Sequence, residues 1–313
     1  MLQKKLFGMV ALLVCAVQLN LSANFSCFDN CSLGDFFYDV GGLNYLSLDT
    51  GYRYDKVTNR AVLYGPATDV FATTQAQTAI NSYILGVKGQ YEFKRLLVKG
   101  NYHYGWIGDG DYFHGNQKGD LRGHLNDGSI ALGFALPSQN CCWLTAFYAG
   151  YSYDGLHTHA NKVRAPFAGA LVNLGKITTK TTIKGPWFGS DIIFRPACDF
   201  TLIIGDDIHF GHWNGSNHFA AGDPGVSFGE IEGFSSNSNQ HNMWGNVFRV
   251  EGYYKVYECW DLGFDLQYTR WVSSGHGRYT PVSSPLPTGI TNNYIIDAKW
   301  ASFSATATIA YVF

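Results

Sequence analysis

The chain has 313 residues and a formal net charge of −2, with 16% aromatic and only 15% charged residues. Soluble domains carry roughly a quarter charged residues, so this composition favours a surface that faces lipid. The net charge argues against a nucleic-acid partner, which would require a basic surface.

The first segment reads as a secretory signal peptide. Lys4 and Lys5 precede an uncharged apolar run over residues 6–17, and Ser22 and Ala23 supply small residues for cleavage. The apolar run is shorter than the roughly 20 residues that a bilayer-spanning helix needs. We therefore expect residues 1–23 to be removed after export, and residues 24–35 to form a periplasmic N-terminal segment.

Residues 36–313 are predicted to form about ten β-strands in one barrel domain. An opening strand lies within residues 36–54, tight turns follow near Lys94, Gln139, Ala197 and Glu258, and a closing strand ends at Phe313. After residue 23 no apolar run could form a membrane helix, so spanning must use strands. The stretches between hairpins are rich in Gly, Asn, Ser, Asp and His and are expected as long loops: residues 53–76, 107–128, 155–184, 211–243 and 273–297. This predicts an all-β, transmembrane antiparallel up-and-down β-barrel with short periplasmic turns and long extracellular loops.

Alternation along the strands separates lipid-facing from inward-facing side chains. In the closing strand, Phe303, Ile309 and Tyr311 share one face, and Ser and Thr residues occupy the other. A charge on the lipid face costs a few kcal/mol, whereas a wet lumen hydrates it. The charged positions predicted to line the lumen are Lys88, Glu92, Lys99, His103, Asp191, Arg195, Asp207, Arg249, Glu251, Lys255 and Asp265. Asp206 is the exception, because strict alternation points it toward lipid unless a bulge intervenes.

Six cysteines follow the signal peptide: Cys27, Cys31, Cys141, Cys142, Cys198 and Cys259. Three of the four predicted periplasmic turns contain at least one of them, and the first two precede the opening strand. All six are therefore expected on the periplasmic side, where thiols oxidise. Intramolecular disulfides and crosslinks to other envelope proteins both remain open, because the count does not fix the pairing. No second pair of ligands matches Cys27 and Cys31, so no metal site is predicted.

The order of segments resembles the omptin-type ten-stranded outer-membrane barrel. The similarity runs through GVKGQYEFKRLLVKGNYHYGW, LTAFYAGYSYDGLHTHA and the final YVF, over most of the mature sequence. Within that superfamily, the cysteine-bearing turns look like the Protochlamydia-type outer membrane proteins of chlamydia-related bacteria, which are regarded as porins. This resemblance implies a pore-forming barrel in the bacterial outer membrane, stapled or crosslinked by disulfides.

Omptins are proteases, and the resemblance implies a pair of carboxylates facing an Asp/His pair around an activated water. Asp109 and Asp111 fit the first pair. In the segment that matches the second pair, the best histidine is His218, but a serine, Ser216, stands where the family has its aspartate. Asp207 and His209 have the right spacing but lie earlier in the chain. The protease machinery is therefore incomplete in the sequence, and no catalytic residue is assigned.

Three functions remain as hypotheses. The first is a pore for small hydrophilic solutes, which requires a wet lumen, although ten strands give a narrow barrel that side chains nearly fill. The second is an omptin-like protease. The third is a structural envelope protein or adhesin that uses its loops for contact and its cysteines for crosslinks. No phosphate loop or dinucleotide fingerprint is present, so no cofactor is predicted.

Overall fold

The computed structural model describes residues 44–64, 70–93, 95–114, 117–137, 143–167, 170–197, 199–221, 233–281 and 292–313. These residues form ten strands: β1 (Tyr45–Tyr64), β2 (Val70–Phe93), β3 (Leu96–His114), β4 (Gln117–Pro137), β5 (Trp143–Phe167), β6 (Ala170–Ala197), β7 (Phe200–Ala221), β8 (Gly233–Tyr257), β9 (Trp260–Pro281) and β10 (Asn292–Val312). The expected signal peptide, the N-terminal segment of residues 24–35 and residues 36–43 of the expected barrel lie outside the described residues.

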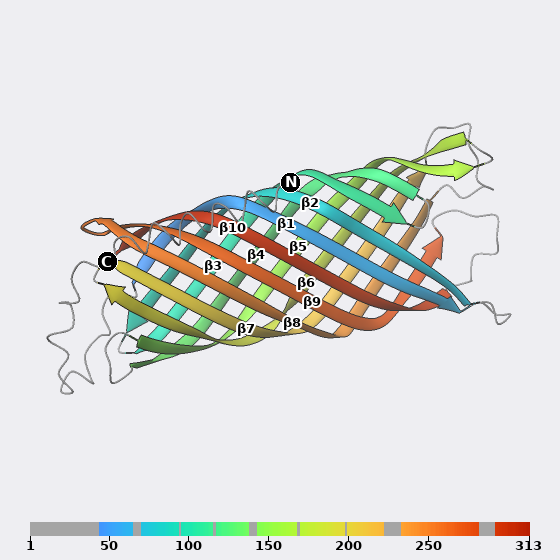
Figure 1. The fold of residues 1–313 in the computed structure, drawn as a ribbon. Helices are drawn as coiled ribbons and strands as arrows, with labels where there is room; N and C mark the ends of the chain where they lie inside the picture. Colours follow the sequence, from blue (N-terminus) through green and yellow to red (C-terminus); the bar gives the residue numbers. More distant parts are fainter. Residues whose placement is uncertain are drawn as a thin grey trace.

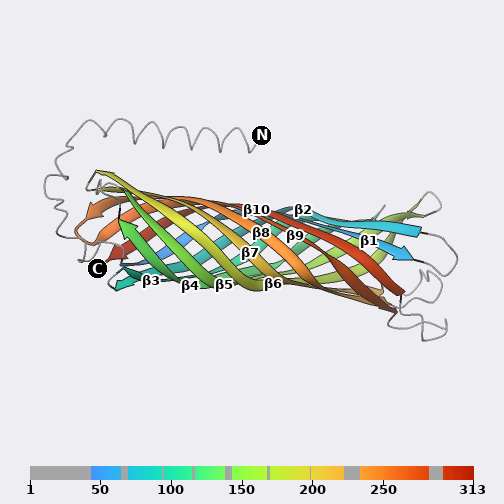
Figure 2. The same ribbon diagram turned by 90° about the horizontal axis from the view of Figure 1, so that it is seen from below.

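The ten strands form a closed antiparallel barrel in which each strand pairs with its neighbours in sequence. The first and last strands close it, from Tyr45 opposite Val312 to Leu63 opposite Tyr294. The barrel is elongated and its strands are strongly tilted (Figure 1, Figure 2). The predicted all-β, up-and-down architecture is confirmed. No helix among the described residues is long and apolar enough to cross a membrane.

The strands are much longer than predicted. They range from 19 residues in β3 to 28 residues in β6, whereas about ten residues suffice to cross the hydrocarbon core. Much of the sequence expected as long loops therefore continues the strands, including residues 107–114, 117–128 and 170–184. At the end of the barrel opposite the C-terminus, residues 65–69, 115–116, 168–169, 222–232 and 282–291 join the strands.

The polarity of the wall reverses partway along each strand. In β10, Ile309 faces outward and Thr308 is buried inside, but farther from the C-terminal end Lys299 faces outward and Trp300 is buried inside. In β3, Val98 is exposed outside the barrel, whereas Asp111 takes the outer face at the far end of the strand. An apolar outer face with a charged interior suits lipid, and a charged outer face with an apolar interior suits water. The half of the barrel nearest the C-terminus is thus the lipid-facing half.

The closing strand follows its predicted alternation. Ile309, Tyr311 and Phe313 are exposed on the outer wall, and Thr306 and Thr308 are buried inside. The exposed tyrosine and phenylalanine rings stack with their centroids 6.2 Å apart. Aromatic side chains at a barrel rim are typical of the membrane interface.

Candidate functional site

The interior of the lipid-facing half holds a dense set of charged side chains. We call this set the charge layer. Its members come from eight of the ten strands, and closure of the barrel brings them together. They are Asp49, Arg53, Asp55, Lys88, Lys99, His103, Asp127, Asp191, Asp207, Arg249, Glu251 and Asp265. All but Asp127 are at least nine-tenths buried.

Lys88 in β2 lies at the centre of one cluster of carboxylates. Its ammonium group contacts Asp265, and it lies 3.7 Å from Asp49 and 3.8 Å from Glu251. Asp265 and Lys88 are 177 positions apart in the sequence. Three carboxylates thus share one cation, an arrangement that a dry interior would strongly penalise.

Arg249 in β8 forms the second cluster. Its guanidinium contacts Asp191 and Asp207 through separate nitrogens, and its Nε lies 3.5 Å from Glu251. Lys99 in β3 also donates to Asp191, at 2.9 Å across the barrel. Glu251 links this cluster to Lys88, so the two clusters form one continuous network.

The third cluster lies farther from the C-terminal end. Arg53 in β1 donates to Asp55 at 3.0 Å and to Asp127 at 2.6 Å. Asp127 also contacts His103 Nδ1 at 2.9 Å, and His103 Nε2 lies 3.4 Å from Asp49. His103 therefore connects this cluster to the carboxylates around Lys88.

Several polar atoms buried in the interior make no hydrogen bond with the described residues. They include Ser47 Oγ, Ser82 Oγ, Thr306 Oγ1 and Asp265 Oδ1. A buried polar atom without a partner costs about 1–3 kcal/mol, so such atoms in proteins are normally satisfied by water. The charge layer has the chemistry of a hydrated interior.

An apolar layer follows the charge layer toward the far end of the barrel. It consists of Val57, Ile80, Ile84, Ile107, Tyr112, Leu121, Leu125, Leu156, Ala160, Val163, Ile177, Ile183, Trp213, Met243, Val247, Trp271, Ala298 and Trp300. The rings of Trp213 and Trp300 meet edge to face, 6.3 Å apart. Trp300 Nε1 donates to Asp55 at 2.7 Å, which joins the two layers directly. With its members buried to 93% or more, this layer resembles the core of a soluble domain and narrows the lumen.

A smaller apolar cluster lies on the other side of the charge layer, toward the C-terminal end. It comprises Leu97, Ala131, Ala135, Leu144, Ala146, Tyr148, Trp187, Ile193, Ile203, Tyr253 and Ala310. Tyr253 donates to Glu251 at 2.6 Å, and Tyr148 donates to Gln90 at 3.1 Å. The hydroxyls of these tyrosines thus turn toward the polar interior while their rings join the cluster.

Most of the charged positions expected in the lumen lie on the inner wall. Lys88, Lys99, His103, Asp191, Asp207, Arg249, Glu251 and Asp265 belong to the charge layer; Glu92 is buried, and Arg195 is half-buried near the C-terminal end of the barrel. The inward position expected for Lys255 is wrong, because its side chain is exposed. The pairing of β8 with β9 shifts register between Lys255 and Tyr257, which ends the strict alternation there. Sequence reasoning missed Asp49, Arg53, Asp55 and Asp127, although the alternation in β1 could have identified the first three.

The residues considered for a protease do not form one site. Asp109 and Asp111 share a face, as their spacing predicts, but it is the outer face, because the register shifts between Ile107 and Asp111. Asp207 lies inside the barrel in contact with Arg249, and His209 Nδ1 lies 2.9 Å from Ser152 Oγ. The backbone of His218 pairs with Ser235 in β8.

Asp206 points to the outer wall, as strict alternation requires. The register of β7 is continuous through Gly205 and Asp207, so no bulge turns it inward. Asn246 on the neighbouring strand donates to Asp206 Oδ1 at 2.7 Å. An amide neighbour therefore partly compensates a carboxylate among the exposed apolar side chains of Ile204 and Ile208.

Cys259 lies in the turn between β8 and β9 and carries a free, half-buried thiol. Its carbonyl accepts a hydrogen bond from Val312 N at 2.8 Å, so this turn lies at the C-terminal end of the barrel. Cys27, Cys31, Cys141, Cys142 and Cys198 lie outside the described residues. Among the described residues, no three His, Cys, Asp or Glu side chains are grouped as a metal site.

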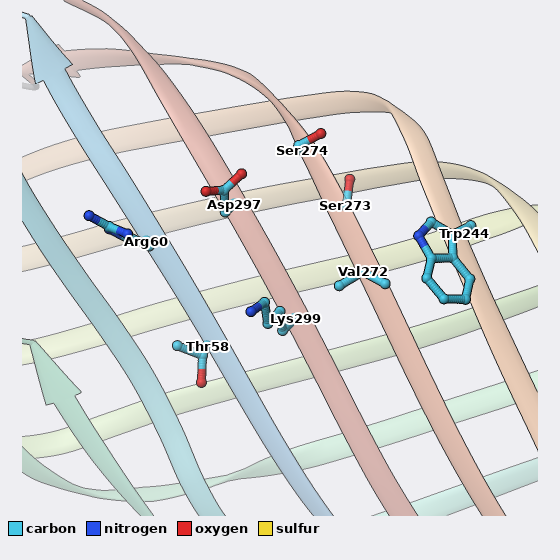
Figure 3. A pocket seen from close by; sticks show the side chains of 8 residues that line it. All are labelled: Thr58, Arg60, Trp244, Val272, Ser273, Ser274, Asp297 and Lys299. Carbon is cyan, nitrogen blue, oxygen red and sulfur yellow. The ribbon is translucent and has the colours of Figure 1, made fainter.

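A groove of about 390 Å³ lies on the wall formed by β8, β9, β10 and β1 (Figure 3). Its lining residues are Thr58, Arg60, Trp244, Val272, Ser273, Ser274, Asp297 and Lys299. Asp297 and Lys299 are exposed while Ala298 and Trp300 between and beside them are buried inside the barrel. The groove is therefore external and does not belong to the lumen.

Comparisons with known structures identify the fold. The outer membrane protease OmpT from Escherichia coli is similar, with a TM-score of 0.69 and 14% identity over 86% of this chain and 97% of that one. The outer membrane protein OprG from Pseudomonas aeruginosa gives a TM-score of 0.37 at 11% identity, covering 87% and 97% of the two chains. The monoaromatic hydrocarbon channel TodX, as a loop-deletion mutant, gives 0.36 at 9% identity, with 94% of each chain covered. At these identities only the OmpT comparison carries weight, and it shows a shared barrel fold alone.

No curated protein matches the chain. The sequence profile of the Protochlamydia outer membrane proteins, by contrast, matches residues 47–313, which include nearly all of the barrel. The closed ten-stranded barrel and its apolar outer band agree with an outer-membrane location. The chain therefore belongs to the Protochlamydia outer membrane protein family and is a β-barrel protein of the bacterial outer membrane.

Proposed function

We propose that the barrel forms a pore of low conductance that passes small hydrophilic solutes across the outer membrane. The charge layer is the aqueous part of the path, and the apolar layer is its narrowest part. The observation that carries this proposal is the charge layer itself, whose members line the interior of the lipid-facing half.

The energetics of buried charge support a hydrated lumen. Desolvating an ion costs several kcal/mol, and apolar side chains of similar volume often replace a buried ion pair without loss of stability. A barrel that served only as a wall would need no such network. Water in the lumen would lower the cost of charges such as Lys88 and would satisfy unpartnered atoms such as Ser82 Oγ.

The apolar layer supports a low conductance. Its three tryptophans are among the most deeply buried side chains of the described residues. Hydrophobic constrictions hinder ion passage because water leaves them readily. Passage through this pore therefore requires side-chain rearrangement around Trp213, Trp271 and Trp300.

Reconstitution of the purified protein in planar bilayers tests the proposal. Small, discrete current steps in 1 M KCl are the expected result, and liposomes containing the protein should swell in solutions of small sugars. A protein that is folded, as judged by its mobility on gels before and after heating, but gives neither current nor swelling is not a pore.

A structural envelope role is the second candidate, and the apolar layer favours it. This layer packs like a soluble core in the half of the barrel that extends beyond the lipid, so the wall there is rigid and offers a large polar outer surface. In that case bilayers would show no current, and disulfide-linked species of high mass, sensitive to reductant, would be found in envelope preparations.

Export and crosslinking belong to the same proposal. We expect residues 1–23 to be cleaved as a signal peptide, which mass spectrometry of the mature N-terminus would test. The six cysteines after it are expected in the periplasm, and the position of the Cys259 turn beside the C-terminal end supports this. Gels run with and without reductant would reveal whether they link within the chain or to partners.

A further inference from the structure

We infer that the lumen selects small monovalent cations over anions, an inference that rests on the pore formation proposed above. The basis is a surplus of carboxylates in the charge layer. The acidic members are Asp49, Asp55, Asp127, Asp191, Asp207, Glu251 and Asp265, and the permanently basic members are Arg53, Lys88, Lys99 and Arg249. Protonation of His103 would reduce the surplus by only one charge.

The surplus results from sharing, because the acidic side chains compete for few cations. Lys88 serves Asp49, Glu251 and Asp265 together. Arg249 serves Asp191, Asp207 and again Glu251.

The same imbalance continues along the lumen toward the apolar layer. Arg53 is the only permanent cation within ion-pair distance of Asp55 or Asp127 among the described residues. The second contact of Asp127 is with His103, which also faces Asp49. An entering solute therefore meets a negative potential over the whole depth of the charge layer, and no described segment of it has a cationic surplus.

Individual atoms indicate what such a solute would contact. Asp265 is 94% buried, and its Oδ1 makes no hydrogen bond with the described residues, while its other oxygen contacts Lys88. A carboxylate oxygen is a hard ligand that suits alkali and alkaline-earth cations. Rings of Asp and Glu side chains have the same effect in cation channels.

The test is the reversal potential of the reconstituted protein across a tenfold KCl gradient. We expect the potential to lie close to that of K⁺, with K⁺ about tenfold more permeant than Cl⁻, since a charged cleft raises the local concentration of counter-ions by at least that factor. Asp207→Asn removes one inward carboxylate of nearly unchanged size and should lower the ratio. Asp206→Asn is the matched control, because the adjacent carboxylate faces the outer wall, and it should leave the ratio unchanged.

The outcomes separate the inference from the proposal beneath it. Absence of any current would refute pore formation. Current with a permeability ratio of one or below, or an equal effect of Asp206→Asn and Asp207→Asn, would overturn cation selectivity while leaving the pore intact. Should Asp207→Asn fail to fold, Asp265→Asn provides the same comparison, because it also removes an inward carboxylate.

Discussion

Arg249→Met is predicted to destabilise the barrel by about 3 kcal/mol, because removing one partner of a buried ion pair leaves uncompensated charge. The substitution keeps the length of the side chain and removes the cation shared by Asp191, Asp207 and Glu251. Asp191 retains Lys99 and Glu251 retains Lys88, whereas Asp207 has no other ion-pair contact within 4 Å among the described residues. The cost is therefore placed at the lower end of the 3–5 kcal/mol range for broken buried pairs.

Equilibrium unfolding in urea, with the protein in lipid vesicles and followed by tryptophan fluorescence, measures this loss. Arg270→Met is the control, since Arg270 is exposed on the outer wall of β9, and it should cost no stability. Adding Asp207→Asn to Arg249→Met should recover about 1 kcal/mol or more, because residues in one ion-pair network are energetically coupled. If Arg249→Met unfolds within about 0.5 kcal/mol of the wild type, a level typical of surface changes, the network is not a buried one and the reasoning fails.

Two further predictions concern packing and the outer wall. Gly86→Ala should destabilise the barrel by about 1–3 kcal/mol, as overpacking does, because the added Cβ would lie 2.0 Å from His103 Cδ2. Gly108→Ala, with no atom within 4 Å of its Cβ, should be close to neutral in the same urea titration, and equal losses for the two would contradict the packing of His103. Asp206→Leu should raise the free energy of unfolding in vesicles by about 1 kcal/mol, because a lipid-facing carboxylate is unfavourable; a loss of stability would show that Asp206 does not face lipid.

The alternation of the strands made the fold and much of the lumen predictable. Charges such as Lys88, Lys99 and Asp265 stand at alternate positions among apolar neighbours, and the cost of placing them in lipid assigns them to the interior. The same rule places Asp206 outside, as the structure has it. Here local sequence sufficed, because the side-chain period of a strand is two residues regardless of distant contacts.

The extent of the strands could not be read in this way. Beyond the lipid-facing half, polar residues such as Lys299 and Asp111 take the outer face, so an apolar outer pattern no longer marks the strand. These segments therefore looked like loops in the sequence. The outer position of Asp109 depends in addition on a register shift, which the sequence does not announce.

The partners within the charge layer also required the structure. Alternation shows that Lys88 and Asp265 both face inward, but only closure of the barrel between β1 and β10, with its observed register, brings them into contact. The position of Trp300 over Arg53, with the guanidinium carbon 5.6 Å from the ring centre, likewise depends on that closure. Pairings between distant strands are non-local, so they are not encoded in any short segment.

Single-channel recording of the wild type beside Trp271→Ala tests the pore and its constriction most directly. Trp271 lies in the apolar layer, 4.9 Å from His209 between ring centres, and packs so closely on Gly245 that a Cβ there would meet its ring at 1.9 Å. We predict small current steps for the wild type and larger ones for Trp271→Ala, with no change for Trp244→Ala on the outer wall. Equal step sizes in wild type and Trp271→Ala, or no current from either folded protein, would contradict a charged lumen narrowed by an apolar layer.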